Sequence, residues 1–255
     1  MSFKDQTILI AGGNRGIGYE LARLLLADQA QVFIVGRSQA RNELAQESLC
    51  AEFGSPDLTM LNADLGNRVE VDDIVHQLEG LFIDHLAVFL GSGKTPFGYN
   101  FPMGHWKTVF DVNFFSIVQV IQSFLPIMNR QGASSSITLT GAISGLERVR
   151  APVTYSVAKA TLISYSNHLA ESLIEDGIRV NTISPGNVFY PGGRWEELLE
   201  EHPEEIKQFL QEAVGMKRLG TAEELAYVYY TTMSSKNSFM TGQNIVVDGL
   251  QTRAP

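Results

Sequence analysis

The sequence is poor in cysteine and in basic residues, and both shortages exclude classes of protein. The one cysteine, Cys50, cannot form an internal disulfide. The 255 residues carry 19 basic and 28 acidic side chains, a formal net charge of -9, without any run of Lys or Arg. This charge argues against nucleic acid or an anionic membrane as a partner. The five histidines show no metal-ligand spacing with Cys50 or with one another, so we expect no bound metal.

Long apolar runs are also missing. No stretch approaches the 18 consecutive apolar residues of a membrane span, and the start MSFKDQTILIAGG has an apolar run too short for a signal peptide. We therefore predict a cytoplasmic protein. With 44% hydrophobic residues and no repeat, low-complexity tract or flexible linker, the chain is expected to fold as a single domain over residues 1–255.

Short apolar runs alternate with longer segments of helical period. The predicted strands are 7–11, 31–35, 58–61, 85–90, 136–140, 178–184 and 244–248, and the predicted helices are 17–28, 39–53, 68–80, 104–129, 154–175 and 222–234. This alternation is typical of β-α-β units and predicts an α/β, doubly wound Rossmann fold with a seven-stranded parallel sheet flanked by helices. Segment 187–215 interrupts it with an acidic amphipathic stretch, which is either a solvated surface helix or a mobile substrate lid.

The glycines of AGGNRGIG predict a phosphate site. Gly12, Gly16 and Gly18 directly follow the first strand and begin the first helix, where backbone N–H groups and the helix dipole favour an anion. Glycine permits the tight turn and lets a pyrophosphate approach the main chain. A glycine turn without a ligand is the alternative interpretation.

The turn after the second strand indicates which dinucleotide is bound. Gly36-Arg37-Ser38 offers no carboxylate to an adenosine ribose, and Arg15 in the glycine loop could reach the same place as Arg37. An arginine fork matches a 2′-phosphate, so NADP(H) is favoured over NAD(H), unless both arginines are solvated surface charges. Asp64, after the third strand, suits either an adenine amino group or a helix N-cap.

Tyr155 and Lys159 predict the chemical centre. They stand four residues apart on the predicted helix 154–175, so both lie on one helix face. Their helix follows strand 136–140, at the edge where open α/β sheets bind ligands. Because a nearby ammonium favours a phenolate, we expect Lys159 to lower the pKa of Tyr155 and make it an acid/base group near neutral pH.

With these motifs the sequence resembles the short-chain dehydrogenase/reductase family over nearly its whole length. AGGNRGIG is similar to the family's TGxxxGxG and YSVAK to its YxxxK, and further matches are SPGNV at 184–188, RLGTAEELA at 218–226 and MTGQNIVVDG at 240–249. The resemblance implies hydride transfer between NAD(P)H and a carbonyl or secondary alcohol, in a tetramer formed through the fourth and fifth helices. It also implies roles: Tyr155 protonates the carbonyl oxygen, Lys159 lowers the pKa of Tyr155 and holds the nicotinamide ribose, and Asn113 keeps a water that links Lys159 to solvent.

The cofactor site predicted from the motifs and the resemblance contains residues from each of these segments. They are Gly12, Asn14, Arg15, Gly16, Ile17, Gly18, Arg37, Ser38, Asp64, Leu65, Gly91, Tyr155, Lys159, Pro185, Gly186 and Val188.

Three departures from the family pattern bear on activity. The catalytic serine, thirteen residues before the tyrosine, is Ala142, and losing such a donor typically costs about 10² to 10³ in rate. Ser144 and Thr140 are candidate substitutes, and we favour Ser144. The family's NNAG is replaced by Val88-Phe89-Leu90-Gly91, and Tyr190 stands where a threonine usually binds the nicotinamide carboxamide.

Two functions remain open at this point. One is an NADP(H)-dependent oxidoreductase acting on a small carbonyl or alcohol substrate, in which Tyr155, Lys159, Asn113 and Ser144 form the catalytic site. The other is a non-catalytic NADP(H)-binding protein, which Ala142 and the lost NNAG favour. Aromatic residues expected near the substrate suggest an apolar or ring-bearing compound, although such residues are often core or oligomer contacts (Phe97, Tyr99, Phe101, Phe189, Tyr190 and Trp195).

Overall fold

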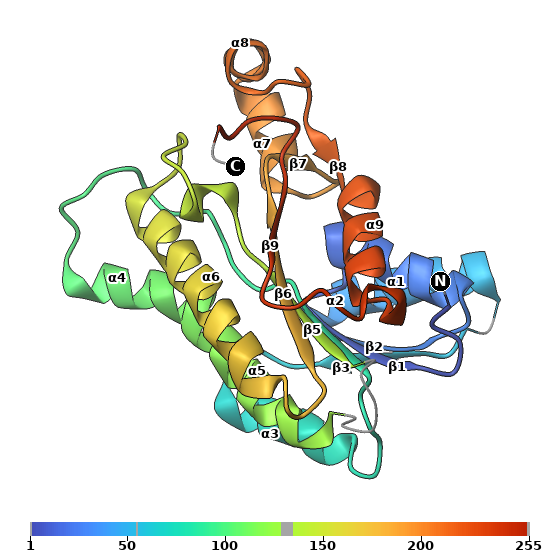
Figure 1. Ribbon diagram of the computed structural model, residues 1–255. Coiled ribbons are helices and arrows are strands. Elements are labelled where there is room, and N and C mark those ends of the chain that lie inside the picture. Colours follow the sequence, from blue (N-terminus) through green and yellow to red (C-terminus); the bar gives the residue numbers. More distant parts are fainter. Residues whose placement is uncertain (1, 55, 129–134, 254–255) are drawn as a thin grey trace.

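A seven-stranded parallel sheet forms the centre of the computed structural model, which describes residues 2–54, 56–128 and 135–253 (Figure 1). Its strands are β1 (Thr7–Ala11), β2 (Gln31–Gly36), β3 (Leu58–Asn62), β4 (His85–Val88), β5 (Ser136–Thr140), β6 (Arg179–Pro185) and β9 (Asn244–Val247). They are arranged in the order β3-β2-β1-β4-β5-β6-β9. The predicted doubly wound fold is confirmed. The order reverses between β1 and β4, which is where such sheets open a crevice for ligands.

Helices cover both faces of the sheet (Figure 1). On one face lie α1 (Gly16–Ala27), α2 (Gln39–Phe53) and α9 (Ala222–Met233); on the other lie α3 (Arg68–Gln77), α4 (Met103–Phe110), α5 (Ser116–Phe124) and α6 (Val153–Leu173). Strand side chains alternate between the two resulting cores. Leu9 belongs to the core under α5, whereas Ile8 and Ile10 belong to the core under α1 and α9.

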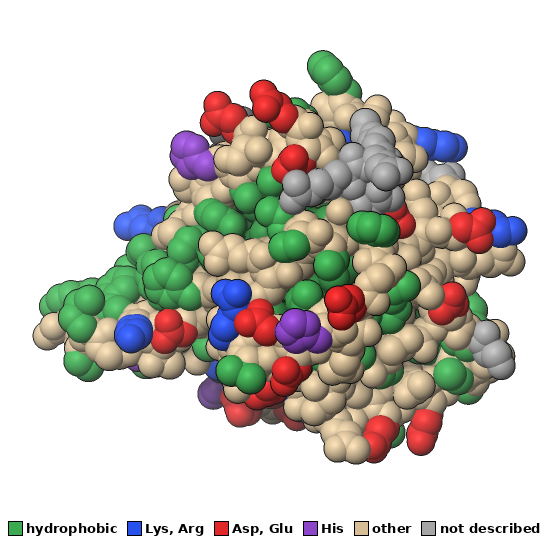
Figure 2. Space-filling view, turned by 90° about the horizontal axis from the view of Figure 1, so that it is seen from below, with side chains coloured by type: hydrophobic (Ala, Val, Ile, Leu, Met, Phe, Trp, Pro, Cys, Tyr) green, Lys and Arg blue, Asp and Glu red, His purple; other side chains and the backbone are tan. Residues whose placement is uncertain are grey.

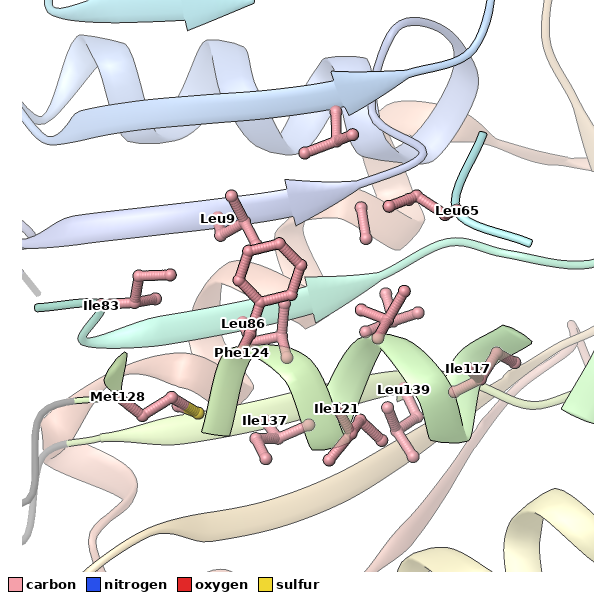
Figure 3. Close-up of a cluster of buried hydrophobic side chains, with 14 of the residues drawn as sticks. Leu9, Leu65, Ile83, Leu86, Ile117, Ile121, Phe124, Met128, Ile137 and Leu139 are labelled. Atoms are coloured by element: carbon pink, nitrogen blue, oxygen red, sulfur yellow. The ribbon is translucent and has the colours of Figure 1, made fainter. Parts of the chain in front are cut away.

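The core under α5 shows why this helix is so apolar (Figure 3). Ile117, Ile121 and Phe124 are each at most 1% exposed and pack among strand residues such as Leu86 and Leu139. Burying each side chain of this size contributes about 1.5–3 kcal/mol. The span 103–127 has a mean hydropathy of 1.4 and is long and apolar enough to cross a membrane, but its buried face belongs to this core.

The predicted helix 104–129 is interrupted, and its residue 129 lies outside the described residues. A π-helical turn (Asp111–Phe115) separates α4 from α5, and a 3-10 turn (Leu125–Ile127) follows α5. Asn113 lies in the π turn and is buried. Single π turns in longer helices often occur at functional sites because they redirect one side chain. Periodicity could not predict this turn, because the apolar pattern continues through it.

Segment 187–215 contains two helices instead of one. Strand β7 (Val188–Phe189) pairs with β8 (Gly220–Thr221), and the acidic stretch forms α7 (Arg194–Glu201) and α8 (Pro203–Ala213). The break falls at His202, directly before a proline, because proline is accepted in the first turn of a helix and not in its interior. Both helices project beyond the carboxyl ends of the strands, at the top of Figure 1.

Candidate active site

A cavity of about 1090 Å³ opens at the carboxyl ends of the central strands and extends to α7 and α8. It brings together most of the predicted site residues from six segments: Gly12, Arg15, Ile17, Gly18, Arg37, Gly91, Ser144, Tyr155, Lys159, Pro185, Gly186 and Val188. Six predicted residues do not line it: Asn14, Gly16, Ser38, Asp64, Leu65 and Asn113. Within the described residues, no group of three or more His, Cys, Asp or Glu side chains could hold a metal ion.

The glycine loop forms one wall of the cavity, at the start of α1. Gly12 has a φ of +88°, and a Cβ at this position would lie 3.0 Å from the carbonyl oxygen of Phe89. A Cβ on Gly18 would lie 2.7 Å from the Cα of Gly13. Side chains are therefore excluded from this turn, which leaves the backbone and the helix N-terminus accessible to an anion.

Two loop residues have partners inside the protein. The Asn14 amide donates to Oδ1 of Asn42 (2.7 Å), and the Asn42 amide donates to the Gly36 carbonyl (2.9 Å), so Asn14 ties the loop to the end of β2. Gly16 is covered by the ring of Tyr190, whose atoms would lie 3.1 Å from a Cβ at Gly16. These contacts explain why both residues are absent from the cavity wall.

Three arginines line the cavity, and the guanidinium of one of them, Arg15, donates to the Gly192 carbonyl (2.7 Å) in the loop before α7. Arg15 and Arg37 were predicted from the sequence, whereas Arg41, in the first turn of α2, was missed. No carboxylate in the described part of the chain lies within 4.0 Å of Arg37 or Arg41. Arg41 follows Arg37 by four residues, a spacing that could have indicated a shared site. Ser38 stands at the N-cap position of α2, and its side chain makes no capping hydrogen bond.

Asp64 and Leu65 follow the end of β3 and do not line the cavity. The Asp64 carboxylate accepts the N–H of Gly66 (2.9 Å), and α3 is capped by Asn67, whose side chain accepts the N–H of Val69. The N-cap interpretation of Asp64 is therefore wrong. Leu65 is only 4% exposed and belongs to the core under α5, so its side chain is not available to a ligand.

Lys159 and Tyr155 lie one helical turn apart on α6 and both face the cavity. The Lys159 Nζ donates to the carbonyl oxygens of Thr140 (2.8 Å) and Leu90 (3.4 Å), and it lies 6.0 Å from the centroid of the Tyr155 ring. Burial lowers the pKa of Lys159 to about 7. The ammonium is thus held by backbone oxygens beside the tyrosine.

The pKa of Tyr155 shifts in the direction opposite to the sequence prediction. Burial, and secondarily the neighbouring Tyr190, raise it to about 12. Removing the phenol from water disfavours the phenolate, and Lys159 makes no direct contact that would offset this penalty. In this structure Tyr155 is therefore a protonated donor at neutral pH.

The Asn113 side chain is linked to the site by hydrogen bonds to the backbone of the loop after β4. Its Oδ1 accepts the N–H of Ser92 (2.9 Å), and its Nδ2 donates to the carbonyls of Ser92 (3.2 Å) and Val109 (3.0 Å). Gly91 lies between Asn113 and Lys159: a Cβ there would meet Asn113 Oδ1 at 2.8 Å and Lys159 Nζ at 3.0 Å. Asn113 and Lys159 thus hold Gly91 from two sides, and only glycine fits.

The hydroxyls near Ala142 differ in their availability. Ala142 presents a methyl group to the cavity. Thr140 donates its hydroxyl to the Val88 carbonyl (2.7 Å) and lies 2.7 Å from the Tyr229 hydroxyl, so its hydrogen is already used. Ser144 also lines the cavity, and its Oγ is buried without a hydrogen-bond partner among the described residues. Of these two hydroxyls, only that of Ser144 therefore has no partner among the described residues.

Apolar packing replaces the missing NNAG. The Phe89 ring lies 4.6 Å from the ring of Tyr229, a fully buried residue of α9 that sequence reasoning did not single out. Phe89 also contacts the glycine loop, because its Cδ2 would lie 3.0 Å from a Cβ on Gly18. Nothing in the sequence distinguished Tyr229 from an ordinary core aromatic on a helix.

Comparison with known proteins decides the family. A family model described as Enoyl-(Acyl carrier protein) reductase matches residues 11–249. The chain belongs to the short-chain dehydrogenase/reductase family. An isoepoxydon dehydrogenase of Penicillium expansum is 28% identical over 250 residues, which cover 96% of this chain and 94% of the relative. The protein is accordingly a member of a family of oxidoreductases that use pyridine nucleotides.

Solved structures agree over the whole chain. A short-chain oxidoreductase of Pseudomonas aeruginosa, described as containing an atypical catalytic center, has a TM-score of 0.91 at 22% identity and covers 100% of both chains. L-sorbose reductase of Gluconobacter frateurii, solved with NADPH and L-sorbose, has a TM-score of 0.90 at 24% identity and covers 100% of this chain and 99% of its own. A 3-oxoacyl-[acyl-carrier protein] reductase of Brucella melitensis, solved with NAD, has a TM-score of 0.86 at 25% identity and covers 99% and 93%.

Proposed function

We propose that this protein is an NADP(H)-dependent oxidoreductase that acts on a carbonyl or secondary alcohol, with Tyr155 as its acid/base group. The observation that carries the proposal is that one cavity is lined by Tyr155, Lys159 and Ser144 together with the glycine loop. The Ser144 hydroxyl has no partner among the described residues. When bound, the nicotinamide supplies or accepts the hydride. The protein's own residues then have to bind and protonate the substrate oxygen.

Each of these residues suits a part of that task. Tyr155 is protonated at neutral pH and can donate to a carbonyl oxygen, and Ser144 can donate a second hydrogen bond where Ala142 cannot. The Lys159 ammonium adds positive charge close to the oxygen that becomes negative in the reaction, and Asn113 fixes the loop beside it. In the opposite direction Tyr155 would accept the alcohol proton once deprotonated.

The cavity also fits the cofactor. A side chain at Gly12, Gly18 or Gly91 would clash with neighbouring protein atoms, so the backbone of this wall stays uncovered. The arginine cluster (Arg37 and Arg41) offers guanidinium groups to a 2′-phosphate. Solved relatives hold either NADPH or NAD, so they do not decide between the two cofactors. The arginine cluster supports the choice of NADP(H). Fluorescence titration with NADPH and NADH tests this choice, and equal dissociation constants would contradict it.

A panel of ketones and aldehydes, followed by NADPH oxidation, tests the activity. We expect turnover that falls by about 10² or more in Tyr155→Phe, because the proton donor is lost. Undiminished activity in this variant would refute the role of Tyr155.

Ala142 supports the alternative, a non-catalytic NADP(H)-binding protein. That protein would bind NADPH without oxidising it on any carbonyl compound, and Ala142→Ser would raise its activity from near zero. If Ser144 already supplies the second donor, Ala142→Ser changes the rate little. The unpartnered Ser144 hydroxyl favours the catalytic protein.

We further propose a cytoplasmic homo-oligomer. Val112 and Phe115 of the π turn and Val153 and Val157 of α6 are 37–51% exposed although they are apolar. Figure 2 shows hydrophobic side chains gathered around α4 at one end of the molecule. Burial of this face between copies would remove it from water. Light scattering coupled to gel filtration tests the proposal, and a monomer at all concentrations would refute it.

A further inference from the structure

The two ends of the cavity have opposite electrostatic character. The glycine-loop end is bounded by the arginine cluster, whereas the other end is closed by α7 and α8. Residues 194–213, which form these helices, contain seven glutamates and only two basic residues, Arg194 and Lys207. The net charge of α7 and α8 therefore makes this end of the cavity less favourable to an anion than the glycine-loop end.

The basic side chains at the α7–α8 end already have acidic partners. Lys94 lies 2.6 Å from Glu197, Arg194 lies 3.1 Å from the same carboxylate, and Arg150 lies 3.0 Å from Glu205. All five residues line the cavity. Such exposed pairs contribute little to folding, but each occupies the donors that a substrate carboxylate or phosphate would need. Of the seven glutamates of α7 and α8, only Glu197 and Glu205 line the cavity, and they engage all three of these basic side chains.

The wall between these pairs is apolar. Trp195 and Phe209 stack with their centroids 5.8 Å apart and their planes at 18°, and both line the cavity. Leu198, Ile206 and Val149 continue this surface. Flat aromatic side chains on one side and branched aliphatic ones beside them suit the carbon skeleton of a ring, which loses contact with water there.

We propose that the substrate is an uncharged carbonyl compound with an apolar, ring-sized body. It would enter as a free small molecule, and not as a thioester of coenzyme A or of an acyl carrier protein, because both carriers bring phosphate groups close to the acidic helices α7 and α8. This proposal rests on the proposed function and adds the class of substrate. It separates this chain from relatives that are named for acyl-carrier-protein substrates.

Matched pairs of substrates test the proposal with NADPH as cofactor. The first pair is the methyl ester of an oxocyclohexanecarboxylic acid and the free acid at neutral pH. The second is acetoacetyl-N-acetylcysteamine, a neutral thioester, and acetoacetyl-coenzyme A. We expect kcat/KM to favour the neutral member by about tenfold or more at low ionic strength, and the ratio to shrink as NaCl screens the glutamates.

Two variants locate the source of the discrimination. Glu197→Gln removes one negative charge and frees Lys94 and Arg194, so the preference for the ester over the acid should fall by about three- to tenfold. Glu212→Gln removes the same charge from α8 at a residue that does not line the cavity, so the preference should fall clearly less than in Glu197→Gln.

The outcomes distinguish this proposal from the one it rests on. Turnover of the free acid or of acetoacetyl-coenzyme A as fast as of its neutral partner would overturn the substrate class and leave the oxidoreductase activity standing. The same fall of the preference in Glu197→Gln and Glu212→Gln would overturn the role of the ion pairs that line the cavity. Tight NADPH binding without reduction of any neutral carbonyl would overturn the proposed function itself, and the substrate class with it.

Discussion

Replacing Ser144 by alanine separates a catalytic hydroxyl from a structural one. The Ser144 Oγ is buried and makes no hydrogen bond within the described part of the protein, although its residue lines the cavity. A structural hydroxyl would lose a bond and weaken the fold when removed. If the hydroxyl bonds only to the substrate, its removal breaks no hydrogen bond in the free protein, because the partner is absent until the substrate binds.

The expected magnitudes follow from this difference. Loss of one positioned donor to a developing oxyanion lowers kcat by about 10² to 10³. The free energy of unfolding should stay the same or rise by up to about 2 kcal/mol, since an unsatisfied buried hydroxyl is itself unfavourable. We therefore expect Ser144→Ala to be at least as stable as the wild type and much less active.

The assay combines steady-state kinetics on a neutral ketone with urea unfolding of the same preparations. Ser166→Ala is the matched control, because the Ser166 Oγ is also buried without a partner but lies in α6 outside the cavity wall. It should resemble Ser144→Ala in stability and the wild type in kcat. A loss in kcat below tenfold for Ser144→Ala, which is under about 1.4 kcal/mol, would refute Ser144 as the substitute for the missing serine.

Three further predictions concern the cofactor, the buried lysine and a helix cap. Arg37→Ala combined with Arg41→Ala should weaken NADPH binding by about tenfold or more and leave NADH binding nearly unchanged, which fluorescence titration measures; equal losses for both would refute a 2′-phosphate role. Because burial lowers the pKa of Lys159 from 10.5 to about 7, the unfolded chain holds more protons than the folded chain between these pH values. Stability should therefore rise with pH from 7 to 10 relative to Lys159→Met, in urea unfolding at each pH, and parallel curves would contradict the shift. Thr221 caps α9 in a reciprocal capping box with Glu224, so Thr221→Ala should lower the free energy of unfolding by about 1 kcal/mol, and an unchanged urea midpoint would speak against this.

The fold followed from local patterns because buried parallel strands and amphipathic helices leave separate periods in a sequence. The glycine loop was equally readable, since its turn excludes side chains at fixed positions. Tyr155 and Lys159 could be paired because four residues on a helix bring two side chains to one face. Their roles in catalysis stay predictions, which the experiments above test.

Other parts of the site depend on contacts between distant segments. The π turn that buries Asn113 interrupts a continuous apolar pattern, and the pKa of Tyr155 is set by burial that spacing alone could not show. Arg41 joins the cavity only because α2 begins beside the glycine loop. Such features arise from packing, which a one-dimensional pattern does not encode.

The sequence by itself determined the order of strands and helices, the glycine loop and the Tyr155–Lys159 pair, because each depends on residues close together in the chain. It also showed that the serine donor had become Ala142. Only the tertiary structure showed which of the two candidate hydroxyls has a partner: Thr140 is bonded to Val88 of β4 and Tyr229 of α9, and Ser144 has no partner among the described residues. Whether a polar group is already satisfied depends on its neighbours in space.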